Sequence, residues 1–339
     1  MVNEQLRVWA PGRVNLIGGH SDYSGGLVLP MAIDLGTTII GQRGHERVVL
    51  VSRDDPEPAE VELDEDNPAG VTPAWARYVA GVVAEVAPTT GFIGQVSTTI
   101  PIGTGLSSSA ALEVAVALAL VGDDRIDRPQ LALACQRAEH RAAGVPCGIM
   151  DQFSSLLGVE GHALLIDCTS LDVTPVPVPD DIAIVVVDSG QRRSLATVGY
   201  ADRRAEVARA AELLGPLPSA SLSDVESLDD GVLRKRARHV VTENQRVRDF
   251  VAVLASGDVA TAGLLMTESH ASLRDNQEVT TPALDSLVDR LVAIPGVHGA
   301  RLTGGGWGGC VVALTDPGVL DEGWTVRPSA GASVESLSA

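Results

Sequence analysis

The sequence contains a glycine- and serine-rich segment suited to binding an anion, Pro101-Ile-Gly-Thr-Gly-Leu-Ser-Ser-Ser-Ala-Ala. It joins an alternating segment typical of a strand (96–101) to an apolar segment typical of a helix (110–121). Gly103 and Gly105 allow the backbone to approach a ligand closely. The serines open a helix whose free N–H groups and positive dipole end favour an anion. A glycine-rich turn followed by serine N-caps would look the same, so this segment alone leaves both interpretations open.

Two common nucleotide-binding motifs are missing from the sequence. A Walker-type loop needs a lysine after its second glycine, and the only lysine is Lys235. A second glycine-rich segment, Thr303-Gly-Gly-Gly-Trp-Gly-Gly-Cys, lies between two predicted strands instead of before a helix, so it is no Rossmann fingerprint. Its density of glycine indicates a backbone that closely approaches a ligand or another loop.

The N-terminal segment from Pro11 to Gly26 combines a fixed cation with hydrogen-bonding groups. It reads Pro-Gly-Arg-Val-Asn-Leu-Ile-Gly-Gly-His-Ser-Asp-Tyr-Ser-Gly-Gly and contains Arg13, His20 and Asp22 within ten residues. Clusters of Asn, Asp, Ser and Gly usually form turns, so His20 and Asp22 in isolation indicate no more than that.

Together these segments resemble the GHMP kinases, and among them the galactokinase type. The N-terminal segment resembles the galactokinase signature, the serine segment the GHMP phosphate loop, and the glycine cluster the third motif. Cys147-Gly-Ile-Met-Asp-Gln-Phe lies between the second and third, and the resemblance runs from about Val8 to Pro328. It implies an α+β, bilobal GHMP kinase fold with the active site in the cleft between the lobes. It also implies a sugar 1-kinase that uses ATP and Mg²⁺.

The resemblance implies a catalytic pair and a metal site. Asp151 matches the aspartate that faces the anomeric hydroxyl of the sugar as a base or charge stabiliser, although alone it would be explained as a helix cap. Arg13 matches the arginine that holds this aspartate ionised and stabilises charge on the transferred group. Glu139 matches the Mg²⁺ ligand, with Ser108 and Ser109 as hydroxyl partners, and Mg²⁺ would bridge the β- and γ-phosphates.

The resemblance also implies which residues contact the two substrates. The serine loop would wrap the phosphates of ATP, and an aromatic residue would lie near the adenine. The implied ATP-binding residues are Gly103, Thr104, Gly105, Leu106, Ser107, Ser108, Ser109 and Trp75. The implied sugar-binding residues are Gly19, His20, Asp22, Gly148 and Tyr200.

One position departs from the family pattern. Galactokinases usually carry a glutamate before the histidine of the first motif, where this chain has Gly18-Gly19-His20. The resemblance implies that this glutamate contacts the sugar near its C6 hydroxyl, so a site without it loses discrimination there. Arabinose or galacturonate is therefore an alternative substrate to galactose.

A non-catalytic, galactokinase-like sugar sensor is the alternative from another functional class. Known sensors of that kind resemble galactokinases but lose part of the serine loop. Here Ser107-Ser-Ser-Ala-Ala is intact, as are Arg13 and Asp151, so the sequence favours an enzyme.

The elements expected to position these motifs fall into two halves. A helix is predicted over 128–143, and the Pro-rich link from Pro175 to Pro179 predicts a boundary between an N-terminal domain, 1–175, and a C-terminal domain, 180–339. Mixed strands and helices in both halves indicate an α+β protein. The polar tail from Val326 onward is expected to be frayed.

Composition limits the partners. A net charge of −19 disfavours nucleic acid and anionic membranes, and it requires a phosphate site that is locally positive or built from backbone amides and a metal ion. No apolar run is long enough to cross a bilayer, and we see no signal peptide, so a cytoplasmic protein is expected. The four cysteines form no C-x-x-C pair, so no zinc or dithiol motif is predicted. The expected partners are a sugar and ATP, and the expected state is a monomer or weak homo-oligomer.

Overall fold

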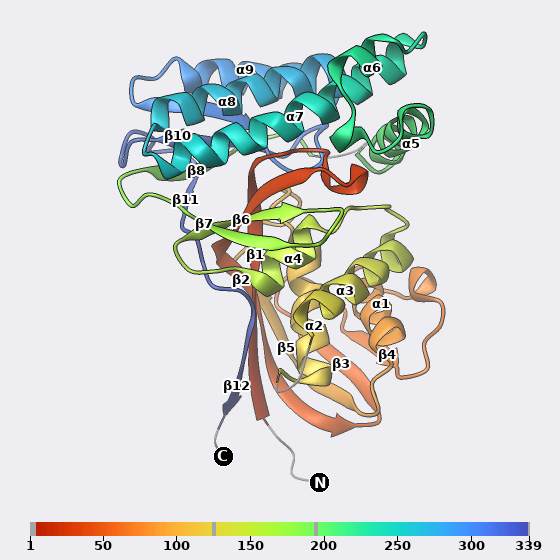
Figure 1. Ribbon diagram of the computed structural model, residues 1–339. Helices are drawn as coiled ribbons and strands as arrows, with labels where there is room; N and C mark the ends of the chain where they lie inside the picture. The colour runs from red at the N-terminus through yellow and green to blue at the C-terminus, as the bar shows by residue number, and fades with distance from the viewer. Residues whose placement is uncertain (1–4, 124–126, 193–195, 338–339) are drawn as a thin grey trace.

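The protein has the predicted α+β fold, and its described residues form two sheets (Figure 1). This computed structural model describes residues 5–123, 127–192 and 196–337. Within these residues, no helix is both long enough and apolar enough to cross a membrane.

The first sheet has eight strands in the described residues. Six follow the order β12-β1-β2-β5-β3-β4, and β6 pairs with β2 and β7. Neighbouring strands are antiparallel except β3 and β5. The bounds are β1 Gln5–Ile17, β2 Leu27–His45, β3 Arg47–Ser52, β4 Ala59–Glu62, β5 Gly91–Thr98, β6 His162–Asp167, β7 Val173–Pro177 and β12 Ser333–Leu337.

Four α-helices accompany the first sheet: α1 Ala76–Val86, α2 Ser108–Val121, α3 Arg128–Ala143 and α4 Met150–Leu157. The predicted helix over 128–143 is confirmed by α3. Helix α2 is buried around most of its circumference, as its continuous Ala, Leu and Val sequence requires. Its core contacts fix the start of the helix, and with it the serine loop, against β1 and α4.

The second sheet has the order β11-β8-β10-β9 and is covered by helices of the C-terminal half (Figure 1). Its strands are β8 Ala183–Asp188, β9 Val297–Leu302, β10 Cys310–Thr315 and β11 Trp324–Val326. The helices are α5 Ala196–Leu214, α6 Leu222–Glu226, α7 Gly231–Ala255, α8 Val259–Ser272 and α9 Pro282–Val292. Short helical turns occur at η1 Asp22–Ser24, η2 Pro68–Gly70, η3 Leu217–Ser219 and η4 Leu273–Gln277.

The C-terminal segment returns to the sheet in which the chain begins. Strand β12 pairs antiparallel with β1, with Val334 opposite Val8, so the prediction of a frayed tail is wrong for 333–337. The physical reason is that β12 supplies the hydrogen-bond partners that the edge of β1 would otherwise lack. The division into 1–175 and 180–339 stays a prediction, and β12 lies on the first sheet although that division assigns it to the C-terminal domain.

Direct hydrogen bonds join the two halves beside the N-terminal motif. The backbone N–H of Gly18 donates to Glu243 Oε1 on α7 at 2.9 Å, and that of Leu27 donates to Asn244 Oδ1 at 2.8 Å. The backbone N–H of Asn15 donates to Thr303 Oγ1 at 3.1 Å. Two of these contacts hold the β1–β2 connection against α7, and the third holds the end of β1 against Thr303, the first residue of the glycine cluster.

Candidate active site

Arg13 on β1 and Asp151 in the first turn of α4 form a bidentate ion pair. Arg13 Nε donates to Asp151 Oδ1 and Nη2 donates to Oδ2, each at 2.7 Å. Arg13 Nη1 donates to the carbonyl of Gly105, also at 2.7 Å. The hydroxyl of Ser107 donates to Asp151 Oδ2. The pair therefore fixes the orientation of the carboxylate and ties it to the serine loop.

The serine loop has the backbone expected of an anion-binding segment. Gly103 and Gly105 have φ of 81° and 90°, and Ser107 has φ of 60°. Ser107 precedes α2 without capping it through its side chain, so the first N–H groups of the helix stay available for a ligand. A non-glycine residue in the left-handed region stores strain, which is common at ligand-binding segments.

A cavity of about 360 Å³ lies along this loop, where the phosphates of a nucleotide are expected. Its lining includes Ser108 and Glu139 from the predicted metal site, and Arg192. The Ser109 hydroxyl donates to Glu139 Oε1 at 2.9 Å. Thr104 and Leu106 do not line the cavity: the Thr104 hydroxyl donates to the carbonyl of Pro101 at 2.7 Å, and the side chain of Leu106 lies in the core. Among the described residues, the lining is Arg13, Gly103, Gly105, Ser107, Ser108, Ser109, Glu139, Asp151 and Arg192.

A second cavity, of about 510 Å³, adjoins the first and shares Gly103, Ser108 and Ser109 with it. Trp75, at the start of α1, and Tyr78 line it, together with the apolar side chains of Val96, Ile102 and Leu112. A flat adenine ring is suited to such an aromatic and apolar lining.

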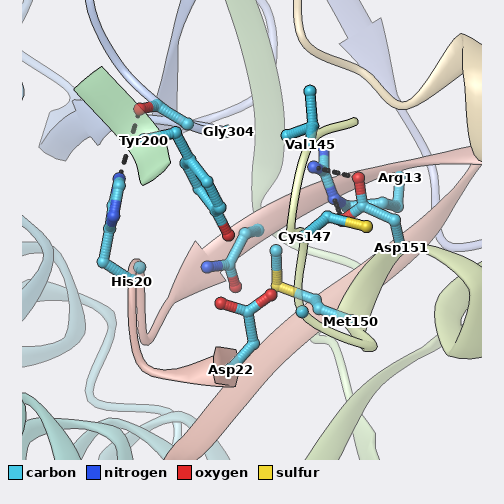
Figure 2. Close-up of a pocket in the computed structure, with 13 residues that line it drawn as sticks. Arg13, His20, Asp22, Val145, Cys147, Met150, Asp151, Tyr200 and Gly304 are labelled. Carbon is cyan, nitrogen blue, oxygen red and sulfur yellow. Dashed lines mark hydrogen bonds and ion pairs between the residues drawn. The ribbon is translucent and has the colours of Figure 1, made fainter. Parts of the chain in front are cut away.

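A third cavity, of about 280 Å³, contains every predicted sugar-binding residue. Figure 2 shows Arg13 and Asp151 on one side of it, and His20 and Tyr200 on the other. Gly304 and Gly305 of the glycine cluster also line it. The described lining is Arg13, Asn15, Gly19, His20, Asp22, Val145, Cys147, Gly148, Met150, Asp151, Tyr200, Gly304 and Gly305.

His20 is a neutral imidazole held in one orientation. Burial, followed by the charge of His239, lowers the pKa of His20 to about 3. Because the carbonyl of Gly305 only accepts, His20 Nε2 carries the proton and donates to it at 3.2 Å. Nδ1 then accepts from the hydroxyl of Tyr23 at 2.9 Å. The Tyr200 ring lies 5.4 Å from both the His20 and the Tyr23 rings.

Asp22 reaches the cavity through the gap that Gly148 leaves. A Cβ at position 148 would overlap the Asp22 carboxylate, so only glycine allows this approach. Burial, followed by the charge of Asp151, raises the pKa of Asp22 to about 6. A carboxyl group with that pKa still accepts hydrogen bonds from sugar hydroxyls at neutral pH.

Several cavity residues were not predicted from the sequence. Asn15 lies within the Pro11–Gly26 motif and Tyr78 lies three residues after Trp75, but neither received a role from the sequence. Arg192 supplies the local positive charge that the net charge of −19 requires at a phosphate site. Its signal in the sequence was the basic pair Arg192-Arg193, in a segment without other motifs.

Comparison with known proteins agrees with this arrangement. The galactokinase galactose-binding signature matches residues 3–43, the GHMP kinase N-terminal domain 77–159 and the GHMP kinase C-terminal domain 250–324. Human galactokinase is 45% identical over 329 residues, which cover 92% of this chain and 84% of that protein. Galactokinase from Actinobacillus succinogenes is 42% identical over 333 residues, which cover 93% of this chain and 86% of that protein.

Solved structures give the same result. The crystal structure of Lactococcus lactis galactokinase complexed with galactose has a TM-score of 0.89 and 32% identity, with 97% of this chain and 95% of that chain covered. Methanococcus jannaschii mevalonate kinase, at 21% identity, has a TM-score of 0.68 over 95% and 98% and shares the fold. From the site geometry, the matched domains and these identities, we conclude that this chain belongs to the galactokinase family of the GHMP kinases.

Proposed function

We propose that this protein transfers the γ-phosphoryl group of ATP to the anomeric hydroxyl of galactose or a closely related aldose. The products are the sugar 1-phosphate and ADP. One observation carries the proposal: Arg13 and Asp151 are the two described residues common to the sugar cavity and the phosphate cavity. Phosphoryl transfer needs such a junction, because the acceptor oxygen must approach the γ-phosphorus in line with the leaving oxygen.

The ion pair orients the acceptor at this junction. Asp151 accepts a hydrogen bond from the anomeric hydroxyl, and the oxygen of that hydroxyl forms the new bond to phosphorus as the bond to ADP breaks and the hydroxyl proton passes to Asp151 or to water. Arg13 holds both carboxylate oxygens of Asp151 and faces the phosphate cavity, where its charge stabilises the transferred group. The backbone N–H groups at the start of α2 and Arg192 stabilise the remaining phosphate charge.

The donor set beside the phosphate cavity fits Mg²⁺. Within the described residues, no group of three or more His, Cys, Asp or Glu side chains forms a complete metal cage. Mg²⁺ is usually held by one or two protein ligands together with phosphates and waters, so the adjacent Glu139 and Ser109 suit it, with Ser108 beside them. The ion would neutralise charge on the β- and γ-phosphates.

The sugar is proposed as galactose, with arabinose and galacturonate as the alternatives that Gly19 favours. His20, Asp22 and Tyr200 supply polar and aromatic side chains to this lining, and Gly148 leaves room for the Asp22 carboxylate. Gly19 contributes no side chain where the family pattern has a carboxylate, so less of the lining selects for a C6 hydroxyl.

We also propose a cytoplasmic protein that acts as a monomer or weak homo-oligomer. Its partners are two small molecules, a sugar and ATP. The net charge of −19 supports the exclusion of nucleic acid and anionic membranes from this proposal.

ADP release tests the function directly. The enzyme should release ADP with galactose, arabinose or galacturonate when Mg²⁺ is present, and phosphorus NMR should place the new ester on the anomeric oxygen. Glucose serves as the control for discrimination at C4. ADP release that no aldose or uronic acid stimulates would contradict the kinase and favour a sugar sensor.

A further inference from the structure

Beside the proposed Mg²⁺ site lies a buried carboxyl group that the mechanism does not use. Glu113 on α2 and Gln152 on α4 are both fully buried. Gln152 Nε2 donates to Glu113 Oε2 at 3.1 Å and to Glu139 Oε2 at 2.7 Å. Both N–H groups of the Gln152 amide are therefore used, one on each glutamate.

The same two side chains leave two acceptors unsatisfied. Among the described residues, Glu113 Oε1 and Gln152 Oε1 are buried and have no hydrogen-bond partner. If Glu113 were ionised, both oxygens could only accept, and each would carry the cost of an unmade hydrogen bond. A proton on Glu113 Oε1 would turn that oxygen into a donor, for which the free oxygen of Gln152 offers an acceptor. One proton would thus satisfy both atoms and close a cyclic acid–amide pair.

The surroundings favour that proton. Burial, followed by the charge of Glu139, raises the pKa of Glu113 well above its usual value. Asp151 also raises this pKa, and the hydrogen bond from Gln152 opposes it. The charged groups that act on Glu113 are thus both carboxylates.

We propose that Glu113 is a protonated positioning residue, whose acid–amide pair with Gln152 directs the second N–H of Gln152 to Glu139 Oε2. This inference rests on the proposed kinase function. Reversing the Gln152 amide would place its oxygen against the Glu139 carboxylate and break the pair, so one orientation is fixed. Glu139 Oε1, the oxygen that accepts from Ser109, is then held beside the phosphate cavity for Mg²⁺. Glu113 acts only through Gln152 and contacts no substrate.

Two substitutions at Glu113 separate the hydrogen bonds of its side chain from the volume that the side chain fills. Glu113→Gln keeps a donor and an acceptor in the same place, whereas Glu113→Met fills the space without either. Glu113→Met and Gln152→Met should weaken Mg²⁺-dependent ADP binding by roughly tenfold to a hundredfold, as loss of an outer partner of a metal ligand typically does. Glu113→Gln should keep the wild-type affinity for ADP in the presence of Mg²⁺. Calorimetric titration of ADP with and without Mg²⁺ measures this, and Mg²⁺-free affinity should stay the same throughout.

A spectroscopic measurement tests the proton without relying on activity. In protein labelled with ¹³C at the glutamate carboxyl carbons, one resonance should keep the position of a protonated acid at neutral pH and disappear in Glu113→Gln. Absence of that resonance in the wild type would overturn the proposal, even if both Met variants failed to fold. Loss of Mg²⁺-dependent binding in Glu113→Gln would also overturn it, because an ionised Glu113 would then be required. An acid resonance in a protein without kinase activity would refute the proposed function and leave the pair in place.

Discussion

The guanidinium group of Arg301 occupies the space into which a side chain at position 19 would project. A Cβ built on Gly19 would lie less than 3.0 Å from Arg301 Nη2. Arg301 is 1% exposed, and among the described residues its Nε and Nη1 atoms have no hydrogen-bond partner. Burial lowers the pKa of Arg301 to about 10, against the opposing charge of Glu243. A buried cation therefore lies directly behind the residue that departs from the family pattern.

Restoring the carboxylate with Gly19→Glu should give a folded enzyme. The φ angle of Gly19 lies outside the left-handed region, and the obstructing atom is the far end of a flexible side chain that can move and pair with the new carboxylate. The new acceptor should raise kcat/KM for galactose relative to arabinose and galacturonate. A hydrogen bond to a charged group contributes on the order of 1.5–3 kcal/mol, which is about one to two powers of ten in specificity.

Steady-state kinetics with the three sugars measure this change, and Gly19→Ala is the matched control because it adds a Cβ without a carboxylate. Unchanged sugar ratios in a folded, active Gly19→Glu enzyme would show that another residue discriminates at C6.

Asp151→Asn should lower kcat and leave ATP affinity nearly unchanged. The amide keeps the size of the side chain but loses the negative charge that faces the acceptor hydroxyl and pairs with Arg13. Loss of a base or stabilising carboxylate typically costs roughly 10²–10⁴ in rate. Single-turnover kinetics give the rate, and calorimetry with a non-hydrolysable ATP analogue gives the affinity. A near-normal kcat would remove Asp151 from the chemistry.

Asp22→Asn should stabilise the ligand-free protein at neutral pH and weaken sugar binding. The folded-state pKa of Asp22, raised to about 6, exceeds the usual value of 3.8. Between these two pH values the folded state therefore binds more protons than the unfolded state does. Wild-type stability therefore falls as pH rises from about 4 to about 6, and the asparagine variant lacks this loss. Thermal unfolding between pH 4 and pH 8 should show a difference that vanishes at the acid end.

The exposed substitution Asp289→Asn is the control for a change of net charge. Equal destabilisation of the Asp22→Asn variant at every pH would show that folding imposes no electrostatic cost on the Asp22 carboxylate of the wild type.

Trp75→Ala should raise KM for ATP without changing KM for the sugar. Trp75 lines the cavity assigned to adenine, whose described lining does not include Asp151. Aromatic contacts contribute about 0.5–1.5 kcal/mol beyond their buried area, so an increase of roughly threefold to tenfold is expected. Trp75→Phe should recover most of the affinity. An unchanged KM for ATP in Trp75→Ala would place the adenine elsewhere.

Family motifs predicted the α+β fold and brought together residues that lie far apart in the chain. Arg13 and Asp151 are 138 residues apart and form two hydrogen bonds. The contact between Gly19 and Arg301 could not be predicted in the same way, because neither segment indicates what the other packs against. Gln152 was likewise not predicted. Its role depends on hydrogen bonds to carboxylates on two other helices, and the residues around it in the sequence do not indicate these contacts. Strand β12 was missed because its short polar sequence gains order only from the edge of β1.

The pairing of β12 with β1 also concerns the order in which the protein is made. Residues 5–9 of β1 pair with 333–337, so this ladder joins segments synthesised more than three hundred residues apart. If β1 pairs with β2 as soon as both are made, the outer edge of β1 stays open until β12 leaves the ribosome. Contacts of such long sequence separation form late and slowly, and an open strand edge attracts other chains meanwhile. A nascent chain stalled after the second sheet would contain the residues that line all three cavities and still expose the edge of the strand that carries Arg13.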